Sequence, residues 1–446
     1  MTRQVADQPP ENKSVFIEKL VHGGWGLGRL PDGKVALVEG ALPGEQVTLQ
    51  LLQARGGRRD YVEATVAKVL NSVPERTKAP CPYYTECGGC NLQHASYSAQ
   101  LRMKAEIVIE SLQRAGISLA QDIVLPPLPS GEQFGYRYRL RLHLESNGNL
   151  GFHRRRSNRV VPINHCLLAT AGINTVLNRV QQEIDLQILA RQVEELEYNQ
   201  CPESGRIFLV LHAKKQAQTK ELHNLAAMLA PMADNVQTTQ GLCLHPQNAS
   251  EQTLLLHQHF YHSGLNYTLH WPAGSFFQVN SLQNENLVSL AMDAAAAPKR
   301  ALDLFCGSGN FSIPMALLGA QVLGIEYSRI TTRWARQNSK LAGLKNTRFV
   351  SGEAAKELAA LHHSKAQFDT ILLDPPRQGL GKAATLLPKL APKRIVSISC
   401  DPATHARDLR LILAGGYRLL KVQPVDMFPQ THHIETMAIL EQAGAD

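Results

Sequence analysis

Cys400 stands where an apolar segment runs into a helix start, a position from which a thiol could act as a nucleophile. Residues 394–399 are apolar enough for a buried strand, and Asp401-Pro402 joins a good N-cap to a good first helical residue. A helix N-terminus favours an anion, so we expect a thiol pKa moderately below its free value of about 8.5, with the charge of Asp401 opposing the shift. The structural alternative is a strand-end cysteine that only packs.

Upstream, residues 303–310 (Asp-Leu-Phe-Cys-Gly-Ser-Gly-Asn) are typical of a nucleotide-cofactor loop between a strand and a helix. The two glycines let the backbone approach a ligand closely. Glu326 and Asp374 end two further predicted strands and face the same crevice, where an acidic side chain can hold a ribose diol. Ser312 replaces the third glycine of a dinucleotide loop, which favours S-adenosyl-L-methionine. An ordinary strand–turn–helix corner is the alternative.

A thiolate beside a methyl donor fits methylation at C5 of a pyrimidine. Addition of the thiolate to C6 turns C5 into a methyl acceptor, and a base must then remove the C5 proton so that the thiolate can leave. Glu435, between two strands of a predicted C-terminal hairpin, could be that base; by itself it would be interpreted as a solvated carboxylate. We expect His432 and His433 to pack or to form hydrogen bonds rather than to catalyse.

Four of the eight cysteines form a pattern typical of a metal site. Cys81, Cys87 and Cys90 lie close together, Gly88-Gly89 provides a tight turn, and Cys166 is a distant fourth ligand. Three close ligands and one remote ligand approach the spacing of iron–sulfur proteins, whereas a Cys₄ zinc site usually has two Cys-x₂-Cys pairs. The pattern therefore favours a [4Fe-4S] cluster over zinc, with free core cysteines third and a disulfide framework excluded.

Length and composition indicate a soluble protein of several domains. The chain has 446 residues, 44% of them hydrophobic and 19% charged, and no apolar run long enough to span a membrane. The start is polar, with no secretory signal, so we expect a cytoplasmic protein. The formal charge of +8 is concentrated in arginine clusters that suit nucleic acid, with solvated strand faces as the alternative: Arg55, Arg58 and Arg59; Arg137, Arg139 and Arg141; Arg154, Arg155, Arg156 and Arg159.

The predicted elements divide the chain into three parts and indicate an α/β fold. Residues 13–72 alternate short strands with glycine turns and predict an OB-like barrel, in which Tyr61 and the nearby arginines could bind single-stranded nucleic acid. Residues 73–277 begin with the cysteines and a helix near 97–115, then become β-rich. Residues 278–446 alternate strands and helices, which predicts a Rossmann-like, doubly wound parallel sheet; its closing antiparallel hairpin favours methyltransferases over dehydrogenases.

The β-rich part contains one strictly alternating segment, residues 134–142. It predicts a strand with Tyr136, Tyr138, Leu140 and Leu142 facing a core and the arginines between them lining the other face. Asn147-Gly148 predicts a hairpin turn. We expect helices near 172–195 and 219–230 to cover this sheet.

These features together resemble the RNA uracil-5-methyltransferase family, especially its iron–sulfur members that act on 23S ribosomal RNA. Residues 23–29 resemble the glycine-rich part of the family's N-terminal TRAM barrel, residues 399–404 its nucleophile motif, and residues 426–435 its closing motif. The resemblance implies an S-adenosyl-L-methionine-dependent enzyme that forms 5-methyluridine through a covalent adduct of Cys400 with uracil C6. It further implies that Glu435 is the base and that a structural [4Fe-4S] cluster is bound by Cys81, Cys87, Cys90 and Cys166.

The resemblance also implies the cofactor contacts and the partners. The cofactor-binding positions are Gln278, Phe305, Asn310, Glu326, Glu353 and Asp374. The expected partner is ribosomal RNA, bound by a monomer with no membrane association. Glu353 stands where the family commonly has Asn or Asp, and Arg377, after Asp374-Pro375-Pro376, replaces the aromatic residue that an amino-methyltransferase would use.

Three alternatives remain open from the sequence. A transfer-RNA uracil-5-methyltransferase and an RNA cytosine-5-methyltransferase share the thiolate chemistry, and a non-catalytic RNA-binding factor could keep the fold. The modified uridine and the number of modified sites are not identified by the residues.

Overall fold

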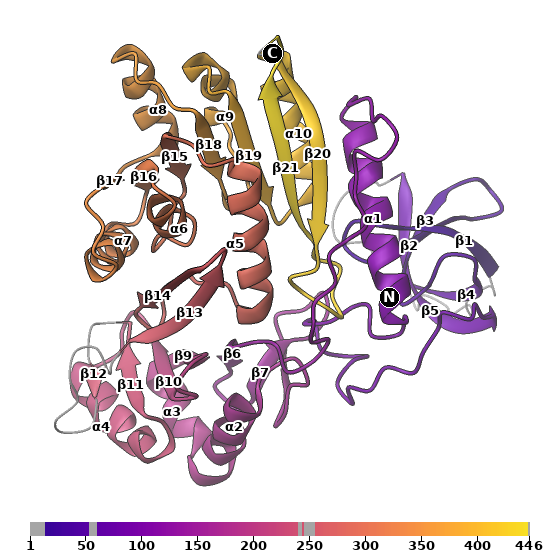
Figure 1. Cartoon of the computed structure of the whole chain (residues 1–446). Coiled ribbons are helices and arrows are strands. Elements are labelled where there is room, and N and C mark those ends of the chain that lie inside the picture. Colours follow the sequence, from indigo (N-terminus) through magenta and orange to yellow (C-terminus); the bar gives the residue numbers. More distant parts are fainter. Residues whose placement is uncertain (1–13, 53–59, 240–242, 245–254, 445–446) are drawn as a thin grey trace, which may run out of the picture.

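The structure, a computed structural model, describes residues 14–52, 60–239, 243–244 and 255–444 (Figure 1). Arg55, Arg58 and Arg59, three of the arginines expected to contact RNA, lie outside these ranges. Within the described part, no helix is long and apolar enough to cross a membrane.

The first part is a closed barrel of five strands in the order β1-β2-β3-β5-β4, as predicted. Buried side chains alternate with more exposed ones along the first three strands, as a half-buried sheet requires. Gly28 is needed where strands cross closely, because a Cβ atom there would lie 2.3 Å from Val15 and 2.4 Å from the carbonyl of Phe16. The strands are β1 (Ser14–Val21), β2 (Trp25–Arg29), β3 (Val35–Glu39), β4 (Gln46–Leu51) and β5 (Tyr61–Asn71).

The central part contains a seven-stranded mixed sheet in the order β12-β11-β10-β9-β6-β7-β8 and a separate hairpin of β13 and β14. One apolar core joins this sheet to its helices. The strands are β6 (Arg139–Leu144), β7 (Leu150–His153), β8 (Val160–Pro162), β9 (Val193–Gln200), β10 (Ile207–Ala213), β11 (Asn235–Thr238), β12 (Cys243–Leu244), β13 (Leu256–His262) and β14 (Leu265–Trp271). The helices are α2 (Ala171–Glu183), α3 (Leu186–Gln192), α4 (Thr219–Leu229) and the 3₁₀ turn η1 (Ala230–Met232).

The helix predicted over 172–195 is divided into α2 and α3, and its last three residues, 193–195, belong to the strand β9. The Asp185 side chain accepts hydrogen bonds from Gln187 N and Ile188 N and so begins a new helix, α3. From Val193 the chain is the strand β9, which pairs with both β6 and β10. Tertiary pairing on two sides thus overrides the helical pattern of the sequence.

The alternating segment 134–142 forms a strand only from Arg139, and in that strand Arg139 and Arg141 lie on the face opposite Leu140 and Leu142, as predicted. Arg139 donates to Glu197 at 2.9 Å, and Arg141 forms an ion pair with Glu195. These glutamates lie on the neighbouring strand β9. Tyr136, Leu140 and Leu142 are buried as predicted, whereas Tyr138 is only half-buried.

The last part is a second seven-stranded sheet in the order β17-β16-β15-β18-β19-β21-β20, parallel except for β21. Its strands are β15 (Arg300–Leu304), β16 (Gln321–Glu326), β17 (Thr347–Ser351), β18 (Thr370–Leu373), β19 (Arg394–Ser399), β20 (Tyr417–Val425) and β21 (Glu435–Gln442). The helices are α5 (Ser281–Ala295), α6 (Ser312–Leu317), α7 (Arg329–Leu341), α8 (Ala354–His363), α9 (Ala383–Leu386), η3 (Leu387–Leu390) and α10 (Pro402–Ala414).

The predicted doubly wound sheet with an antiparallel closing hairpin is therefore confirmed. The strand order reverses between β15 and β18, and ligands bind at such a switch, at the carboxyl ends of the strands. The helix α1 (Tyr97–Arg114), which precedes the central sheet in sequence, runs alongside α10 and shares an apolar core with it (Figure 1). The amino-terminal half of the chain thus packs directly on the element that follows Cys400.

Candidate active site and cysteine pocket

Cys400 and Glu435 are brought together by the register of β19 and β21. Ser399 pairs with Thr436 at the last position of this antiparallel ladder, so the next pair along is Cys400 and Glu435. Directly opposite residues of antiparallel strands have side chains on the same face. Glu435 is 3% exposed, whereas Cys400 is half-buried. A reacting group at Cys400 is therefore within reach of a buried carboxyl.

The thiol pKa differs from the sequence-based expectation. Asp401 does cap α10, accepting from Thr404 N at 2.8 Å, but the pKa of the Cys400 thiol is raised to about 12 rather than lowered. Burial is the largest cause, and the carboxyls of Glu435 and Asp374 add to it, while Arg377 opposes it. Two acidic neighbours and lost hydration outweigh the helix end. The free protein thus holds a protonated thiol at neutral pH.

Asp374 and Glu435 form a coupled acidic pair beside this thiol. Burial raises the pKa of both carboxyls, and the charge of Asp374 raises the pKa of Glu435 further. The positive charge of Arg377 opposes the rise in the pKa of both Glu435 and Cys400. Two carboxyls that cannot easily ionise together can exchange a proton near neutrality, which is the property a general base needs.

A buried hydrogen-bond network lies behind the pair. His405, on α10, contacts Thr436 Oγ1 at 2.6 Å and Ser397 Oγ at 3.0 Å, and Thr436 Oγ1 donates to the Ser399 carbonyl. Burial lowers the pKa of His405 to about 4, so this ring is neutral. The network fixes the ends of β19 and β21, and with them the backbones of Cys400 and Glu435.

The loop that connects β20 to β21, residues 426–434, is held from the amino-terminal half of the chain. Lys104 on α1 donates to Asp426 Oδ1 at 2.6 Å, and neither side chain is exposed. Gln100 exchanges hydrogen bonds with Gln430 through its side-chain amide. The start of β21, where Glu435 lies, is thereby fixed against α1.

His432 and His433 lie in this loop and form contacts of the expected kind. His432 N donates to Asn91 Oδ1, and His433 Nε2 lies 3.5 Å from Arg377 Nη2. Burial lowers the pKa of His432 to about 4 and that of His433 to about 2. Both rings are neutral around pH 7.

The predicted cofactor loop opens the crevice at the end of β15. Phe305 has a φ of +64°, which is rare for a residue with a side chain, and a Cβ atom at Gly307 would meet nothing within 4 Å. Glu326 accepts from Gly307 N at 3.2 Å and from Ser328 N at 2.8 Å. Asp303 is fully buried, bonded to Ser312 Oγ, and its pKa is raised to about 7. Open space above Gly307, bordered by Glu326, suits a cofactor with hydroxyl groups.

The other predicted cofactor positions lie at the ends of the same sheet or beside them. Asn310 forms a reciprocal amide pair with Asn284 of α5, with both distances 3.0 Å. Gln278 is half-buried in the segment between β14 and α5, next to Phe277, which stacks on Trp271. Glu353 is exposed just beyond β17, as the N-cap position of α8.

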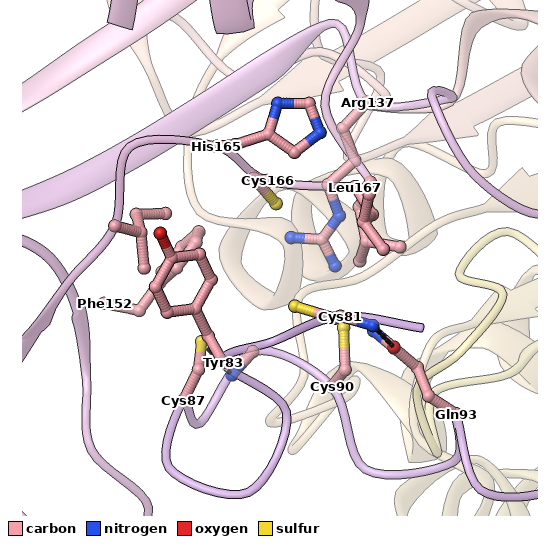
Figure 2. Close-up of a pocket in the computed structure, with 13 residues that line it drawn as sticks. Cys81, Tyr83, Cys87, Cys90, Gln93, Arg137, Phe152, His165, Cys166 and Leu167 are labelled. Carbon is pink, nitrogen blue, oxygen red and sulfur yellow. Dashed lines mark hydrogen bonds between the residues drawn. The ribbon is translucent and has the colours of Figure 1, made fainter. Parts of the chain in front are cut away.

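Cys81, Cys87, Cys90 and Cys166 line one pocket, together with Gln93 and Arg137 (Figure 2). Burial and the neighbouring thiols raise the pKa of Cys87 to about 11 and that of Cys90 to about 12. In the part of the chain that the structure describes, no three His, Cys, Asp or Glu side chains adopt the geometry of a bound metal site. The four thiols share a pocket, but their sulfurs do not have ligand geometry.

Arg137 lines this pocket, and Arg155 binds the backbone of the segment that contains three of its cysteines. Arg155 donates to the carbonyls of Tyr84, Cys87 and Cys90, and it also forms an ion pair with Glu39 of the barrel. The Arg137 side chain points among the sulfurs, and its Nε atom is buried without a hydrogen-bond partner (Figure 2). A buried cation with an unsatisfied donor beside four thiols fits an anionic, thiolate-bound group.

The sequence patterns do not indicate Arg377, His405 or Lys104 as site residues, and they group Arg137 with arginines that suit nucleic acid, whereas its side chain lines the buried cysteine pocket. Arg377 was identified only as a departure from an aromatic motif, although its place after Asp374 was a usable signal. The others contact residues that are remote in sequence, so no local pattern could have indicated them.

Comparison with known proteins gives concordant matches. The family model described as tRNA (Uracil-5-)-methyltransferase matches residues 97–443. An uncharacterized RNA methyltransferase of Aquifex aeolicus is 34% identical over 95% of this chain and 97% of its own. The 23S rRNA (uracil(1939)-C(5))-methyltransferase RlmD of Aeromonas hydrophila is 33% identical over 97% of each chain.

A solved structure shares the fold. The tRNA (uracil-54, C5)-methyltransferase of Pyrococcus abyssi, in complex with S-adenosyl-L-homocysteine, aligns with a TM-score of 0.71 at 22% identity. The alignment covers 96% of this chain and 99% of that one. The predicted α/β methyltransferase fold is thus confirmed.

Proposed function

Because the chain belongs to the tRNA (uracil-5-)-methyltransferase family, we propose that it methylates C5 of a uridine in 23S ribosomal RNA with S-adenosyl-L-methionine as methyl donor. The observation that carries the proposal is the adjacency of Cys400 and Glu435 at the carboxyl edge of the sheet. The named activity of the full-length relatives favours ribosomal RNA over transfer RNA, and uridine over cytidine.

Cys400 is the proposed nucleophile. Its thiol loses a proton to solvent, the sulfur bonds to C6 of the uracil, and the electron pair of the C5–C6 double bond becomes available at C5. After C5 has gained the methyl group, Glu435 in its ionised form removes the C5 proton, the double bond reforms, and the S–C6 bond breaks so that the sulfur leaves as a thiolate and takes up a proton from solvent. Because Glu435 is buried with a raised pKa, it holds that proton well once it has taken it.

The proposed cofactor residues surround the crevice of β15, β16 and β18. When bound, S-adenosyl-L-methionine supplies an electrophilic methyl group. Glu326 is placed to accept from ribose hydroxyls, and the positive φ of Phe305 turns the loop so that Gly307 leaves space for the ligand. Asn310, Gln278, Asp374 and the exposed Glu353 are the other proposed contacts, and the charge of Asp374 also acts on the Cys400 thiol.

Cys81, Cys87, Cys90 and Cys166 are proposed to bind a [4Fe-4S] cluster. The supporting observations are the single shared pocket and the unpaired Arg137 Nε. When bound, the cluster supplies a covalent link between the segment 81–90 and Cys166 of the central part, with no redox step. Arg155 orients three carbonyls of the same segment.

We propose that the chain has the three domains predicted from its sequence: a TRAM barrel over 13–72, a central domain over 73–277 and a methyltransferase domain over 278–446. We further propose that the protein works as a cytoplasmic monomer on ribosomal RNA. In this arrangement the barrel and the central domain hold the RNA, and the target base leaves its stack to expose C5 and C6.

The test is mass-spectrometric mapping of 5-methyluridine in ribosomal and transfer RNA from cells that lack the gene, complemented with wild-type protein or with Cys400→Ala. Loss of one 23S position, restored by the wild type alone, is expected. Loss confined to transfer RNA, or to 5-methylcytidine, would establish one of the alternatives instead.

A further inference from the structure

A groove of about 530 Å³ lies where the barrel, the cysteine segment and the central sheet meet. We call it the histidine groove. Its volume is in the range of sites that hold a small ligand, and its lining does not include Cys400 or Glu435. Its walls are Glu39 of β3, residues 88–91, His143 of β6 and residues 152–158.

Arg155 and Arg156 hold the walls of the histidine groove together. Arg155 pairs with Glu39 at 2.7 Å and donates to two carbonyls of the cysteine segment. Arg156 forms an ion pair with Glu63 of β5, and its guanidinium lies 5.7 Å from the centre of the Trp25 ring. The barrel is thereby bound to the central part through two successive residues. A ligand would find the groove preformed, so binding would not have to order its walls.

Two histidine rings form a stacking platform in the groove. His143 and His153 both line it, with ring centroids 3.7 Å apart and an interplanar angle of 24°. Burial lowers the pKa of His143, so its ring is neutral around pH 7, and its Nδ1 atom lies 2.9 Å from Glu195 Oε1, which fixes the ring orientation. Histidine is among the side chains on which unpaired RNA bases stack, and stacking tolerates any base. The platform therefore suits the flat face of a nucleobase.

Arg154 provides an exposed positive charge at the groove. It pairs with Glu86, and the two side chains are 52% and 54% exposed. An ion pair between such exposed groups contributes little to stability, so a phosphate can replace the carboxylate at small cost. Arg155 and Arg156 differ, because their side chains are only 15% and 22% exposed within their own pairs. Of these three arginines, Arg154 is therefore the one that suits a phosphate.

Asn91 connects the histidine groove to the candidate active site. It lines the groove, and its Oδ1 atom accepts from His432 N at 2.8 Å. His432 belongs to the loop 426–434, which leads to Glu435. An RNA strand held in the groove would thus contact the residue that orients this loop.

We propose that the histidine groove binds one unpaired nucleotide of the RNA substrate, with the base on the His143–His153 pair and the phosphate on Arg154. The proposal rests on the proposed function and names a second point, away from Cys400, at which the RNA is held. An unpaired nucleotide is favoured over duplex RNA, because a base that is paired and stacked within a helix presents no free face to the rings.

The test uses the purified full-length protein without methyl donor. Fluorescence anisotropy measures its affinity for a fluorescein-labelled twelve-nucleotide oligouridine and for the duplex that this strand forms with oligoadenosine. His153→Ala should bind the single strand roughly five- to fiftyfold more weakly, in the range of a lost stacking contact, and should bind the duplex as wild type does. His153→Phe keeps an aromatic ring and should retain most of the single-strand affinity.

Arg154→Ala tests the phosphate contact. The plot of log affinity against log salt concentration should become less steep by about 0.7 for the single strand, whereas Arg154→Lys should keep the wild-type slope. Arg179→Ala is the matched control, because Arg179 also forms an exposed ion pair, with Glu183 on its own helix, but does not line the groove. This control should leave both the affinity and the slope unchanged.

Wild-type affinity of His153→Ala for the single strand would overturn the proposal, and so would an equal loss of affinity for single strand and duplex. An unchanged salt slope in Arg154→Ala would likewise overturn it. Binding is measured here without methyl transfer, so failure of this proposal is distinct from failure of the proposed function, which a methylation assay with Cys400→Ala tests separately.

Discussion

Glu435 is the cross-strand neighbour of Cys400, because the antiparallel register of β19 and β21 ends with Ser399 opposite Thr436. The hydrogen bond from Thr436 Oγ1 to the Ser399 carbonyl, 3.1 Å long, locks that last pair. The nucleophile and the base are therefore positioned by one strand pairing, although they lie on opposite sides of α10 and β20 in the sequence. This arrangement places a proton acceptor beside the sulfur without any loop movement.

Glu435→Gln should separate addition from release. The variant retains Cys400 and can still form the sulfur–C6 bond, but glutamine cannot accept the C5 proton, so a protein–RNA adduct should accumulate and survive denaturing electrophoresis. Turnover should fall at least a hundredfold, in the range of a lost general base. The double variant Cys400→Ala/Glu435→Gln is the control and should form no adduct. An adduct-free Glu435→Gln enzyme with wild-type turnover would remove Glu435 from the mechanism.

Glu435→Gln should also be more stable than wild type at neutral pH. In the folded chain the pKa of Glu435 lies well above its ordinary value of 4.5. Between the unfolded and folded pKa values the unfolded chain has lost a proton that the folded chain keeps, so wild-type stability falls as pH rises, by about 1.4 kcal/mol per unit. Glutamine has no titratable group, so the variant lacks this pH-dependent loss of stability.

Chemical denaturation at pH 5, 6 and 7 measures this effect. The stability advantage of Glu435→Gln should grow with each step in pH. A difference that is constant or that shrinks as pH rises would show that the carboxyl is ionised in the free enzyme.

Removing one partner of the buried Lys104–Asp426 ion pair should lower the free energy of unfolding far more than replacing both partners with apolar side chains. Lys104→Met leaves Asp426 buried without its partner and should lower the free energy of unfolding by about 3–5 kcal/mol. The double variant Lys104→Met/Asp426→Leu removes both charges and should recover most of the loss. If Lys104→Met and the double variant are equally destabilising, the ion pair is not what the site requires.

Arg137→Met should weaken retention of the proposed cluster. Thiolate ligands make the site anionic, and the arginine whose Nε lacks a partner is the cation directed at it. After anaerobic reconstitution, iron and sulfide content should match wild type at first and then decline several-fold faster in the presence of a chelator. Arg137→Lys, which keeps the charge, is the control and should lie between the two. Equal loss rates for all three proteins would exclude a counter-ion role.

The sequence predicts where several strands end, but it does not predict the pKa values of the side chains that meet at those ends. The strands Gln321–Glu326 and Arg394–Ser399 have their predicted limits, because apolar runs bounded by turn residues report burial directly. The high thiol pKa of Cys400 was missed because it depends on Asp374 and Glu435 meeting in space. Likewise, the sequence predicts a helix up to residue 195, past the start of β9 at Val193, because the strands that pair with β9 are remote in sequence.

The central claim is that the Cys400 sulfur bonds to C6 of the target uracil. The most direct measurement is incubation with S-adenosyl-L-methionine and 23S ribosomal RNA fragments in which 5-fluorouridine replaces uridine, since fluorine at C5 cannot be removed as a proton. We expect a denaturation-stable complex in which mass spectrometry locates the fluorinated, methylated nucleotide on Cys400, and no complex with Cys400→Ala. Methyl transfer to natural RNA by a protein that forms no such complex, or a cross-link to another residue, would contradict the account.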